Sequence, residues 1–412
     1  MTNTHLIRIT DVHPADAGTW LVTFYHGATE TQIIWPGTPP QVGDILETDL
    51  ANPGHQPRLI GRPQEKAWTP LENDALRWRH PLPKGAAGDM TNRIHILRQR
   101  HLIRQAVRRY FDNADFSEID APLLVRGTTP DMAVESFALD DRYLVTSTEY
   151  QMKRLAIGGF EKIYSLTQNF RRGDSGTYRN PEFTMLEWGR VGESMRDIEK
   201  DAEGLVTNAM QALGLSETLT FQGQTISMRG PWKRISVMEA IQQATHVTIN
   251  DFDAPSLAKA LQATGLEIRA EWMDDSDFLF SLLMDHIQPK LGTEYPVFIT
   301  EWPLYQTASS ARNEDDPKCA ARSELFIAGV ELSDGFAGLA DPLLQEQSFS
   351  FMLDRRKSGG QEAVKIDQYY LDAMRLGAPY GAGMALGFDR LVMLLTDQPH
   401  IRNVLAFNWD EV

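Results

Sequence analysis

The most constraining feature of the sequence is the segment 170–190, FRRGDSGTYRNPEFTMLEWGR. It opens with two arginines, turns through a Gly/Asp/Ser stretch at 173–176 and returns as the strand-like run FTMLEW. Strand-like flanks around such a loop predict a β-hairpin. An arginine at its mouth can grip a phosphate through a planar fork of donors, and Glu182 and Glu187 can face a cationic group. Taken alone, the segment is better explained as a surface hairpin with a solvated charge cluster.

A second segment, 322–341, carries the carboxylates Glu324 and Glu331 on either side of an Ala328-Gly329 turn. Its two short apolar stretches predict another hairpin. Folded back, the two carboxylates can converge on one divalent cation, and hard oxygen ligands suit Mg²⁺.

The third segment, 381–395, predicts a glycine-rich strand that runs into an apolar helix, with Arg390 at the junction. Glycine allows close backbone approach to a ligand, and arginine supplies a fixed positive charge. Each segment alone is only a weak indication. Together, in this order, an arginine, a carboxylate pair and a second arginine predict a nucleoside triphosphate site.

Four strings carry a family resemblance: TSTEYQMKRL (146–155), NPEFTMLEW (180–188), the GVEL–DGF pattern (329–336) and ALGFDRLVML (385–394). They resemble the motifs of class II aminoacyl-tRNA synthetases of the lysine type, and most of all the truncated ligases that attach (R)-β-lysine to elongation factor P. The resemblance extends from about residue 91 to the C-terminus. It is specific because several long strings agree in order and spacing.

The resemblance implies an α+β fold with an antiparallel sheet flanked by helices. It also implies a ligase in which an amino-acid carboxylate attacks the α-phosphorus of ATP, giving an aminoacyl adenylate and pyrophosphate, with Mg²⁺ as the metal. Such a reaction depends on holding two anions together and neutralising charge as it develops. The expected acceptor is an elongation factor P-like protein, with tRNA less favoured, and the expected assembly is a homodimer.

The resemblance also assigns residue roles. Arg171 and Arg390 are the expected catalytic residues, Arg171 on the α-phosphate and substrate carboxylate and Arg390 on the terminal phosphate. Glu324 and Glu331 are the expected magnesium ligands. The expected ATP site contains Arg171, Asn180, Glu331, Leu332, Gly387 and Arg390. The expected amino-acid site contains Ser147, Glu149, Glu182, Gly189, Asp334, Gly338 and Ala385.

Several positions depart from the lysine-type pattern. In motif 2, Gly173 replaces the glutamate associated with adenine recognition, for which Asp174 can compensate, and Arg179 replaces a histidine. In the amino-acid pocket, glycine stands where lysine-binding members have a tyrosine (189) and a glutamate (338), Asp334 replaces an asparagine, and Ala385 matches the elongation factor P ligases. We therefore expect a wider pocket without a carboxylate, poorly suited to lysine and permissive toward a bulkier or less basic side chain.

Composition restricts the remaining possibilities. The net charge of −16 argues against broad nonspecific nucleic-acid binding, although a local basic patch would be compatible with it. The lone cysteine, Cys319, excludes an internal disulfide and is interpreted as a structural thiol. We expect no signal peptide and no membrane span, and therefore a cytoplasmic protein.

We expect three regions: a small, barrel-like β domain over 1–70, a linker over 71–90 and the catalytic domain over 91–412. Strands are predicted at 5–9, 20–25, 32–35 and 44–47. This domain is interpreted as a structural or protein-docking module at least as readily as an RNA binder, because aromatic and basic residues are not interleaved in it.

An arginine-rich helix is predicted from 92 to 111, capped by Thr91, with its charges either solvated or facing an acidic partner. The region 93–125 is the expected dimer interface. Four further helices are predicted at 196–213, 236–244, 255–264 and 276–290, with Ser236 and Asp253 as N-caps.

The sequence leaves three functions open. The first is an ATP-dependent ligase of the type that modifies elongation factor P, with either lysine or an altered amino acid as its substrate. The second is an amino-acid-activating enzyme with an RNA or carrier-protein acceptor. The third is a non-catalytic synthetase paralogue, against which the retained arginines and paired carboxylates argue.

Overall fold

The computed structural model describes residues 4–16, 18–26, 29–42, 44–50, 57–61, 81–84 and 89–412. The chain divides into two compact units, residues 1–100 with 403–406 and residues 101–402 with 407–412. In the described part of the chain, no helix combines the length and apolarity needed to cross a bilayer.

The N-terminal unit contains an antiparallel five-stranded sheet in the order β3-β2-β1-β4-β5. Its strands are β1 (Thr4–Pro14), β2 (Thr19–His26), β3 (Thr29–Pro36), β4 (Ile45–Asp49) and β5 (Arg58–Gly61). The four predicted strands are present, and β5 is an addition. The buried core is formed by Ile7, Ile9, Val22, Phe24 and Leu46.

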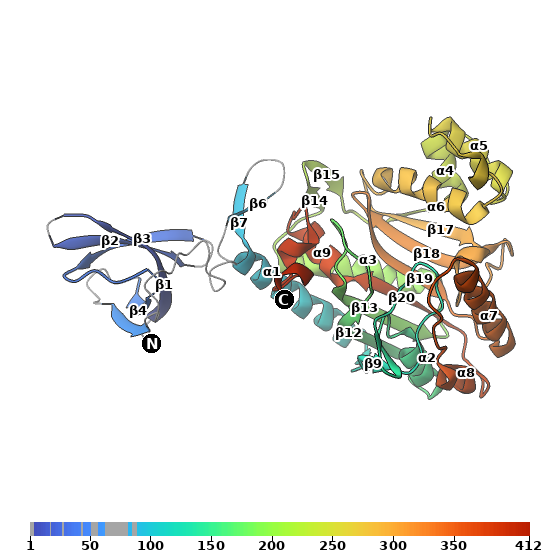
Figure 1. Ribbon diagram of the computed structural model, residues 1–412, viewed down its shortest axis with the longest axis horizontal. Coiled ribbons are helices and arrows are strands. Elements are labelled where there is room, and N and C mark those ends of the chain that lie inside the picture. The colour runs from blue at the N-terminus through green and yellow to red at the C-terminus, as the bar shows by residue number, and fades with distance from the viewer. Residues whose placement is uncertain are drawn as a thin grey trace. The chain divides into compact units, whose positions relative to one another are not determined.

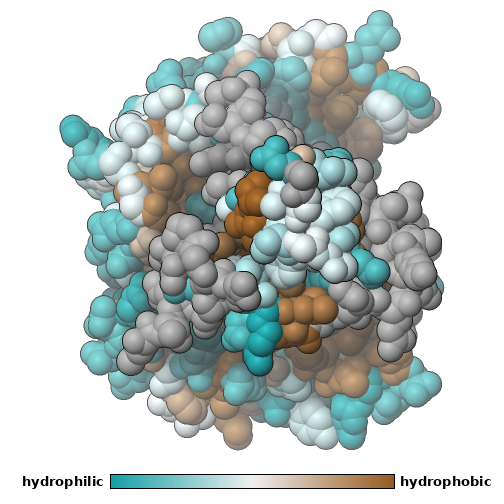
Figure 2. Space-filling model, turned by 90° about the vertical axis from the view of Figure 1, so that its left-hand side faces the viewer, coloured by the Kyte–Doolittle hydropathy of each residue, from teal (hydrophilic) through white to brown (hydrophobic). Residues whose placement is uncertain are grey.

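Apolar side chains on the surface of this sheet are scattered. Ile34 is 60% exposed, and Leu59 and Ile60 are also exposed. Among the coloured atoms of Figure 2, brown residues are interspersed with teal ones and do not form one continuous patch. Single exposed apolar residues are normal on a protein surface, so these three do not by themselves indicate a binding site.

The predicted linker of residues 71–90 lies largely outside the described residues. Its described parts contribute to a two-stranded ribbon of β6 (Pro81–Lys84) and β7 (Asp89–Asn92). The helix α1 (Arg93–Asn113) follows directly. The prediction that Thr91 caps this helix is wrong, because it is the Asn92 side chain that accepts a hydrogen bond from the His95 backbone N–H, at 3.0 Å.

The second unit is built on an eight-stranded sheet in the order β16-β17-β18-β19-β20-β13-β12-β8 (Figure 1). Its strands are β8 (Ser117–Glu118), β12 (Lys162–Phe170), β13 (Glu182–Val191), β16 (Lys233–Ser236), β17 (Val297–Pro303), β18 (Cys319–Ile327), β19 (Val330–Ala337) and β20 (Gly381–Gly387). Only the two outermost pairings, β16–β17 and β12–β8, are parallel among the described strands. The predicted antiparallel sheet flanked by helices is therefore confirmed.

Two small sheets accompany the large one, a three-stranded sheet and a hairpin. Their strands are β9 (Leu124–Val125), β10 (Ala138–Leu139), β11 (Arg142–Leu144), β14 (Thr218–Phe221) and β15 (Gln224–Ser227).

The helices of this unit are α2 (Glu149–Ile157), α3 (Met195–Ala212), α4 (Val237–Thr245), α5 (Ala254–Ala263), α6 (Ser276–Ile287), α7 (Pro342–Ser358), α8 (Gln368–Met374) and α9 (Phe388–Leu395). The four helices predicted between 196 and 290 are present as α3, α4, α5 and α6, with bounds within three residues of the predicted ones, and further helices accompany them. Short 3₁₀ helices are η2 (Ala270–Trp272), η3 (Gln288–Lys290), η4 (Leu304–Gln306), η5 (Ile401–Val404) and η6 (Trp409–Glu411). Ser236 and Asp253 cap α4 and α5 as predicted, each accepting a hydrogen bond from a backbone N–H.

The sheet brings the three predicted segments together although they are far apart in sequence. The 170–190 segment forms the hairpin between β12 and β13, and β20 pairs with β13 on one side and with β19 on the other. The carboxylate hairpin of β18 and β19 is thus only one strand away from the arginine hairpin. The helices α4, α5 and α6 lie near β17, whereas α2 and α8 pack together near β12 and β13 (Figure 1).

Candidate active site

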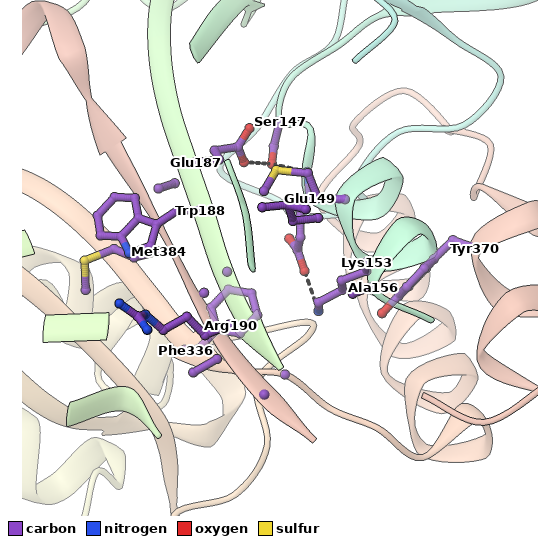
Figure 3. A pocket seen from close by; sticks show the side chains of 18 of the residues that line it. Ser147, Glu149, Lys153, Ala156, Glu187, Trp188, Arg190, Phe336, Tyr370 and Met384 are labelled. Carbon is purple, nitrogen blue, oxygen red and sulfur yellow. Dashed lines mark hydrogen bonds and ion pairs between the residues drawn. The ribbon is translucent and has the colours of Figure 1, made fainter. Parts of the chain in front are cut away.

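A cavity of about 270 Å³ opens on the β13–β20–β19 part of the sheet, beside α2. Its wall contains half of the residues expected at the site: Ser147, Glu149, Arg171, Gly189, Asp334, Gly338 and Ala385. All but one of these come from the expected amino-acid site, and the exception is Arg171. Figure 3 shows the side chains from α2 and from the sheet that face each other here.

Strand pairing determines which residues form the floor of the cavity, because residues two apart in a strand lie on the same face of the sheet. Across the three strands, Glu187, Ala385 and Asp334 form one row. Gly189, Gly383 and Phe336 form the next row. The floor is then continued by Gly338, whose N–H donates to the Gly381 carbonyl at 2.9 Å. The cavity thus runs along the strands from an acidic row to a floor rich in glycine.

The glycines leave space above the cavity floor because they have no side chain, but not every one of these positions sterically requires glycine. A Cβ on residue 189 would lie 3.5 Å from the Ala382 carbonyl oxygen, and one on residue 338 would lie 3.5 Å from Lys153 Cε. Both are ordinary contact distances, and neither residue has a positive φ. By contrast, a Cβ on Gly381 would collide with the Arg190 carbonyl oxygen at 2.4 Å. Side chains are therefore admissible at 189 and 338.

Glu187 is held by groups at the start of α2. It accepts hydrogen bonds from the Ser147 hydroxyl at 2.5 Å and from the Thr148 N–H at 2.7 Å. Burial raises the pKa of Glu187, although these hydrogen bonds act in the opposite direction. Ser147, expected on the substrate amino group, therefore also fixes a buried carboxyl at the cavity wall.

Arg171 has donor capacity left unused. Its guanidinium carbon lies 5.2 Å from the centre of the Phe183 ring, which supports it from one side. Its Nε is buried and has no hydrogen-bond partner among the described residues. A buried charged donor without a partner costs free energy, so this position is suited to an anionic ligand.

The second expected arginine lies at the start of α9 and contacts the carboxylate hairpin. Arg390 donates to the Glu331 carbonyl oxygen at 2.6 Å and to the Tyr178 carbonyl oxygen at 3.2 Å, and lies 3.5 Å from the Glu331 carboxylate. Burial alone would raise the pKa of Glu331. The charges of Arg390, Arg322 and Arg171 outweigh this effect and lower the pKa, so Glu331 is a carboxylate at neutral pH.

Glu324, the other expected magnesium ligand, is paired with Arg322 at 2.7 Å. Burial raises its pKa despite the neighbouring arginine. No group of three or more His, Cys, Asp or Glu side chains suited to a metal occurs among the described residues. Two carboxylates fit a hard cation when the other ligands are phosphate oxygens and water, which is how Mg²⁺ is usually bound beside a nucleotide.

The other expected residues lie outside the cavity wall. The amide of Asn180 donates to the Glu182 backbone carbonyl at 2.5 Å and accepts from the Trp409 N–H at 3.1 Å. Leu332 is buried in β19, and Gly387 is the residue before α9. Glu182, expected in the amino-acid site, lies 3.5 Å from the Gln168 side chain and does not line this cavity.

The two departures in the motif 2 loop contact each other. Arg179 Nη1 lies 3.5 Å from Asp174 Oδ1. Gly173 has a φ of +83°, a conformation that favours glycine. The two residues that distinguish this loop from the family pattern are therefore accommodated together: Gly173 adopts the positive φ, and Arg179, which replaces the histidine, contacts Asp174.

The residues of the cavity wall that sequence reasoning missed include Lys153, Phe336 and Tyr370. Lys153 follows Glu149 by four residues on α2, and its Nζ lies 2.7 Å from Glu149 Oε1. The spacing within TSTEYQMKRL predicts such a pair once a helix is assumed. The positions of Phe336 and Tyr370 depend on tertiary packing and have no comparable local signal.

The fold and the site define a class of enzyme, the class II synthetases. The sequence matches the family of tRNA synthetases class II (D, K and N) over residues 89–411, and the chain belongs to this family. It is accordingly a ligase of the amino-acid-activating, ATP-dependent type.

Its relatives within this family include lysine–tRNA ligases. That of Carboxydothermus hydrogenoformans is 34% identical over 354 residues, which are 84% of this chain and 71% of the relative. That of Chloroflexus aurantiacus is 33% identical over 324 residues, 77% of this chain and 65% of the relative. That of Magnetococcus marinus is 32% identical over 357 residues, 84% of this chain and 70% of the relative.

Proposed function

We propose that this enzyme activates an amino acid other than lysine as its adenylate and transfers it to an elongation factor P-like protein. The observation that carries the activation step is the buried, unpartnered Nε of Arg171 in a cavity that also holds Glu149. A cation and a carboxylate at one cavity can hold the two ends of an amino acid.

In this proposal Glu149 binds the substrate ammonium and Arg171 binds its carboxylate together with the α-phosphate of ATP. Arg390 contacts the terminal phosphate, and Asn180, Leu332 and Gly387 form the nucleotide site. Glu324 and Glu331 would hold Mg²⁺, which when bound neutralises phosphate charge. The role of the protein is positioning and preorganised charge, which suffices for attack on an activated phosphate.

The protein acceptor is supported by the resemblance to the elongation factor P ligases, including Ala385. A tRNA acceptor is the second candidate, because the relatives described above are lysine–tRNA ligases and because a β domain precedes the catalytic unit. We place the enzyme in the cytoplasm as a homodimer, with the region 93–125 at the interface.

Amino-acid-dependent exchange between ATP and pyrophosphate tests the activation step. We expect exchange with at least one amino acid from a screen of α- and β-amino acids, and none without an amino acid. Transfer of the labelled amino acid to purified elongation factor P, compared with total tRNA, then separates the acceptors. If none of the amino acids in the screen supports exchange, the result would favour a non-catalytic paralogue.

A further inference from the structure

The glycine-rich end of the cavity is occupied by a cation. Lys153 projects from α2 toward residue 338, where a Cβ would lie 3.7 Å from its Nζ. The Lys153 ammonium lies 5.1 Å from the centre of the Phe336 ring and 5.8 Å from that of Tyr370 (Figure 3). Aromatic faces attract a cation and hold it in place.

The ammonium retains binding capacity. It forms an ion pair with Glu149 Oε1 at 2.7 Å, and because an ammonium has three N–H donors, it can bind a second anion as well. Burial acts to lower the pKa of Lys153, yet the charge of Glu149 and the Tyr370 hydroxyl raise it, so the group is charged at neutral pH.

The other charged residues of the cavity wall, apart from Glu149 and Arg171, are engaged elsewhere or exposed. Asp334 is paired with Arg322, Glu187 is hydrogen-bonded by Ser147 and Thr148, and Arg190 is paired with Asp201. Asp131 accepts a hydrogen bond from the Ala133 N–H, and Glu161 is exposed. Lys153 is therefore the cation that faces the open floor at Gly338.

Charge balance then determines which substrate side chain fits. If the substrate ammonium binds Glu149, that carboxylate is shared, and Lys153 is left with a weaker counter-charge. A lysine side chain would add a second cation beside it in a buried place, which is costly. A carboxylate would restore neutrality and form a charge-assisted hydrogen bond.

We propose that Lys153, with Phe336 and Tyr370, forms a subsite for a carboxylate on the substrate side chain, so that the enzyme activates an acidic amino acid. This inference rests on the proposed amino-acid activation and names its substrate class. Lys153 is the specificity-determining residue, and Gly338 provides the space.

The test is ATP–pyrophosphate exchange with L-glutamate and L-2-aminoadipate, compared with L-glutamine, L-lysine and L-norleucine. In the wild type we expect kcat/KM for glutamate to exceed that for glutamine by ~10–100-fold, the value of one hydrogen bond to a charged group. Lys153→Met should bring the ratio close to one, mainly through KM, and Lys153→Arg should retain an acidic preference. Arg154→Met is the matched control, because Arg154 is exposed on the same helix, lies outside the cavity wall, and should leave the ratio unchanged.

Gly338→Glu provides a second route should Lys153→Met fail to fold, since the new carboxylate would neutralise Lys153 and lower the acidic preference. Equal rates for glutamate and glutamine in the wild type, a preference for lysine, or an unchanged ratio in Lys153→Met would overturn the inference. If no amino acid supports exchange, the activation proposal fails. Calorimetric binding of L-glutamate, L-glutamine and L-lysine then decides the subsite separately, with tighter glutamate binding supporting it and equal or tighter lysine binding refuting it.

Discussion

Arg322 donates two hydrogen bonds to the Asp334 carboxylate, from Nε at 2.8 Å and from Nη2 at 3.0 Å. The same Nη2 donates to Glu324 at 2.7 Å. One guanidinium thus joins the wall of the amino-acid cavity to a carboxylate expected at the metal. All three side chains are at least two-thirds buried, so the cluster is sensitive to loss of its cation.

Arg322→Met should destabilise the fold by ~3–5 kcal/mol at pH 8, because it leaves two buried carboxylates unpaired. Burial already raises the pKa of Asp334 and Glu324. The contribution of these two carboxyls to the free energy of unfolding is present at low pH, where they are protonated. It is lost as the pH rises through their raised pKa in the folded protein. The deficit relative to wild type should therefore be smaller at pH 5 than at pH 8, as measured by urea unfolding. Arg229→Met, at an exposed ion pair, is the control, and an equal deficit at both pH values would contradict the argument.

Arg171→Ala and Arg390→Ala should each reduce ATP–pyrophosphate exchange by ~10²–10³-fold, the usual cost of one preorganised charge contact. Their effects on stability should differ. Arg390 makes two hydrogen bonds to backbone carbonyls, whereas Arg171 Nε has no partner among the described residues. Thermal unfolding should show the larger loss for Arg390→Ala, and Arg229→Ala should change neither property. Near wild-type exchange in both variants would refute these roles.

The large features of the fold could be predicted because they have local signals. The hairpin at 170–190, the Ala328–Gly329 turn and the glycine strand before Arg390 combine turn residues with alternating apolar residues, and all three form as expected. The caps at Ser236 and Asp253 follow from the same local chemistry.

The content of the cavity was harder to predict. The family pattern shows which side chains are missing at 189 and 338, but it does not show which residue faces the space that their absence leaves in the cavity. That neighbour is Lys153, which arrives from α2 through tertiary packing. The cap of α1 was misplaced by one residue because Thr91 and Asn92 are both good caps, and only the hydrogen bond from the His95 N–H to the Asn92 side chain distinguishes them.

The proposed dimer predicts a role for apolar residues exposed within the region 93–125. Leu102, Leu123 and Leu124 are 41%, 40% and 48% exposed. Covering such side chains with a second copy would remove apolar area from water. Leu123→Glu with Leu124→Glu should convert a dimer to a monomer in light scattering, whereas Leu376→Glu, at a side chain 86% exposed elsewhere, should not. A wild type that is monomeric at every concentration would contradict the proposal.

The final prediction concerns the two glycines of the cavity floor. Gly189→Tyr with Gly338→Glu should shift amino-acid preference toward lysine or β-lysine. Both sites have room for a Cβ, with nearest contacts of 3.5 Å. The carboxylate introduced at position 338 would compensate the charge of Lys153, and the aromatic ring introduced at position 189 would narrow the floor around a flexible chain. The double variant Gly189→Ala with Gly338→Ala is the control, because it adds a Cβ at both positions without the ring or the carboxylate.

Exchange rates for L-lysine and (R)-β-lysine relative to L-norleucine and L-glutamate give the readout. We expect the lysine-to-glutamate ratio to rise by ~10–100-fold in the variant that carries the ring and the carboxylate, which corresponds to one charged hydrogen bond gained and one lost repulsion. The alanine pair should change the absolute rates with little change in that ratio. A wild type that already prefers lysine by a wide margin would show that another acid replaces the missing glutamate. Asp334 is one such residue on the cavity wall, but it is held by Arg322, which would then have to release it.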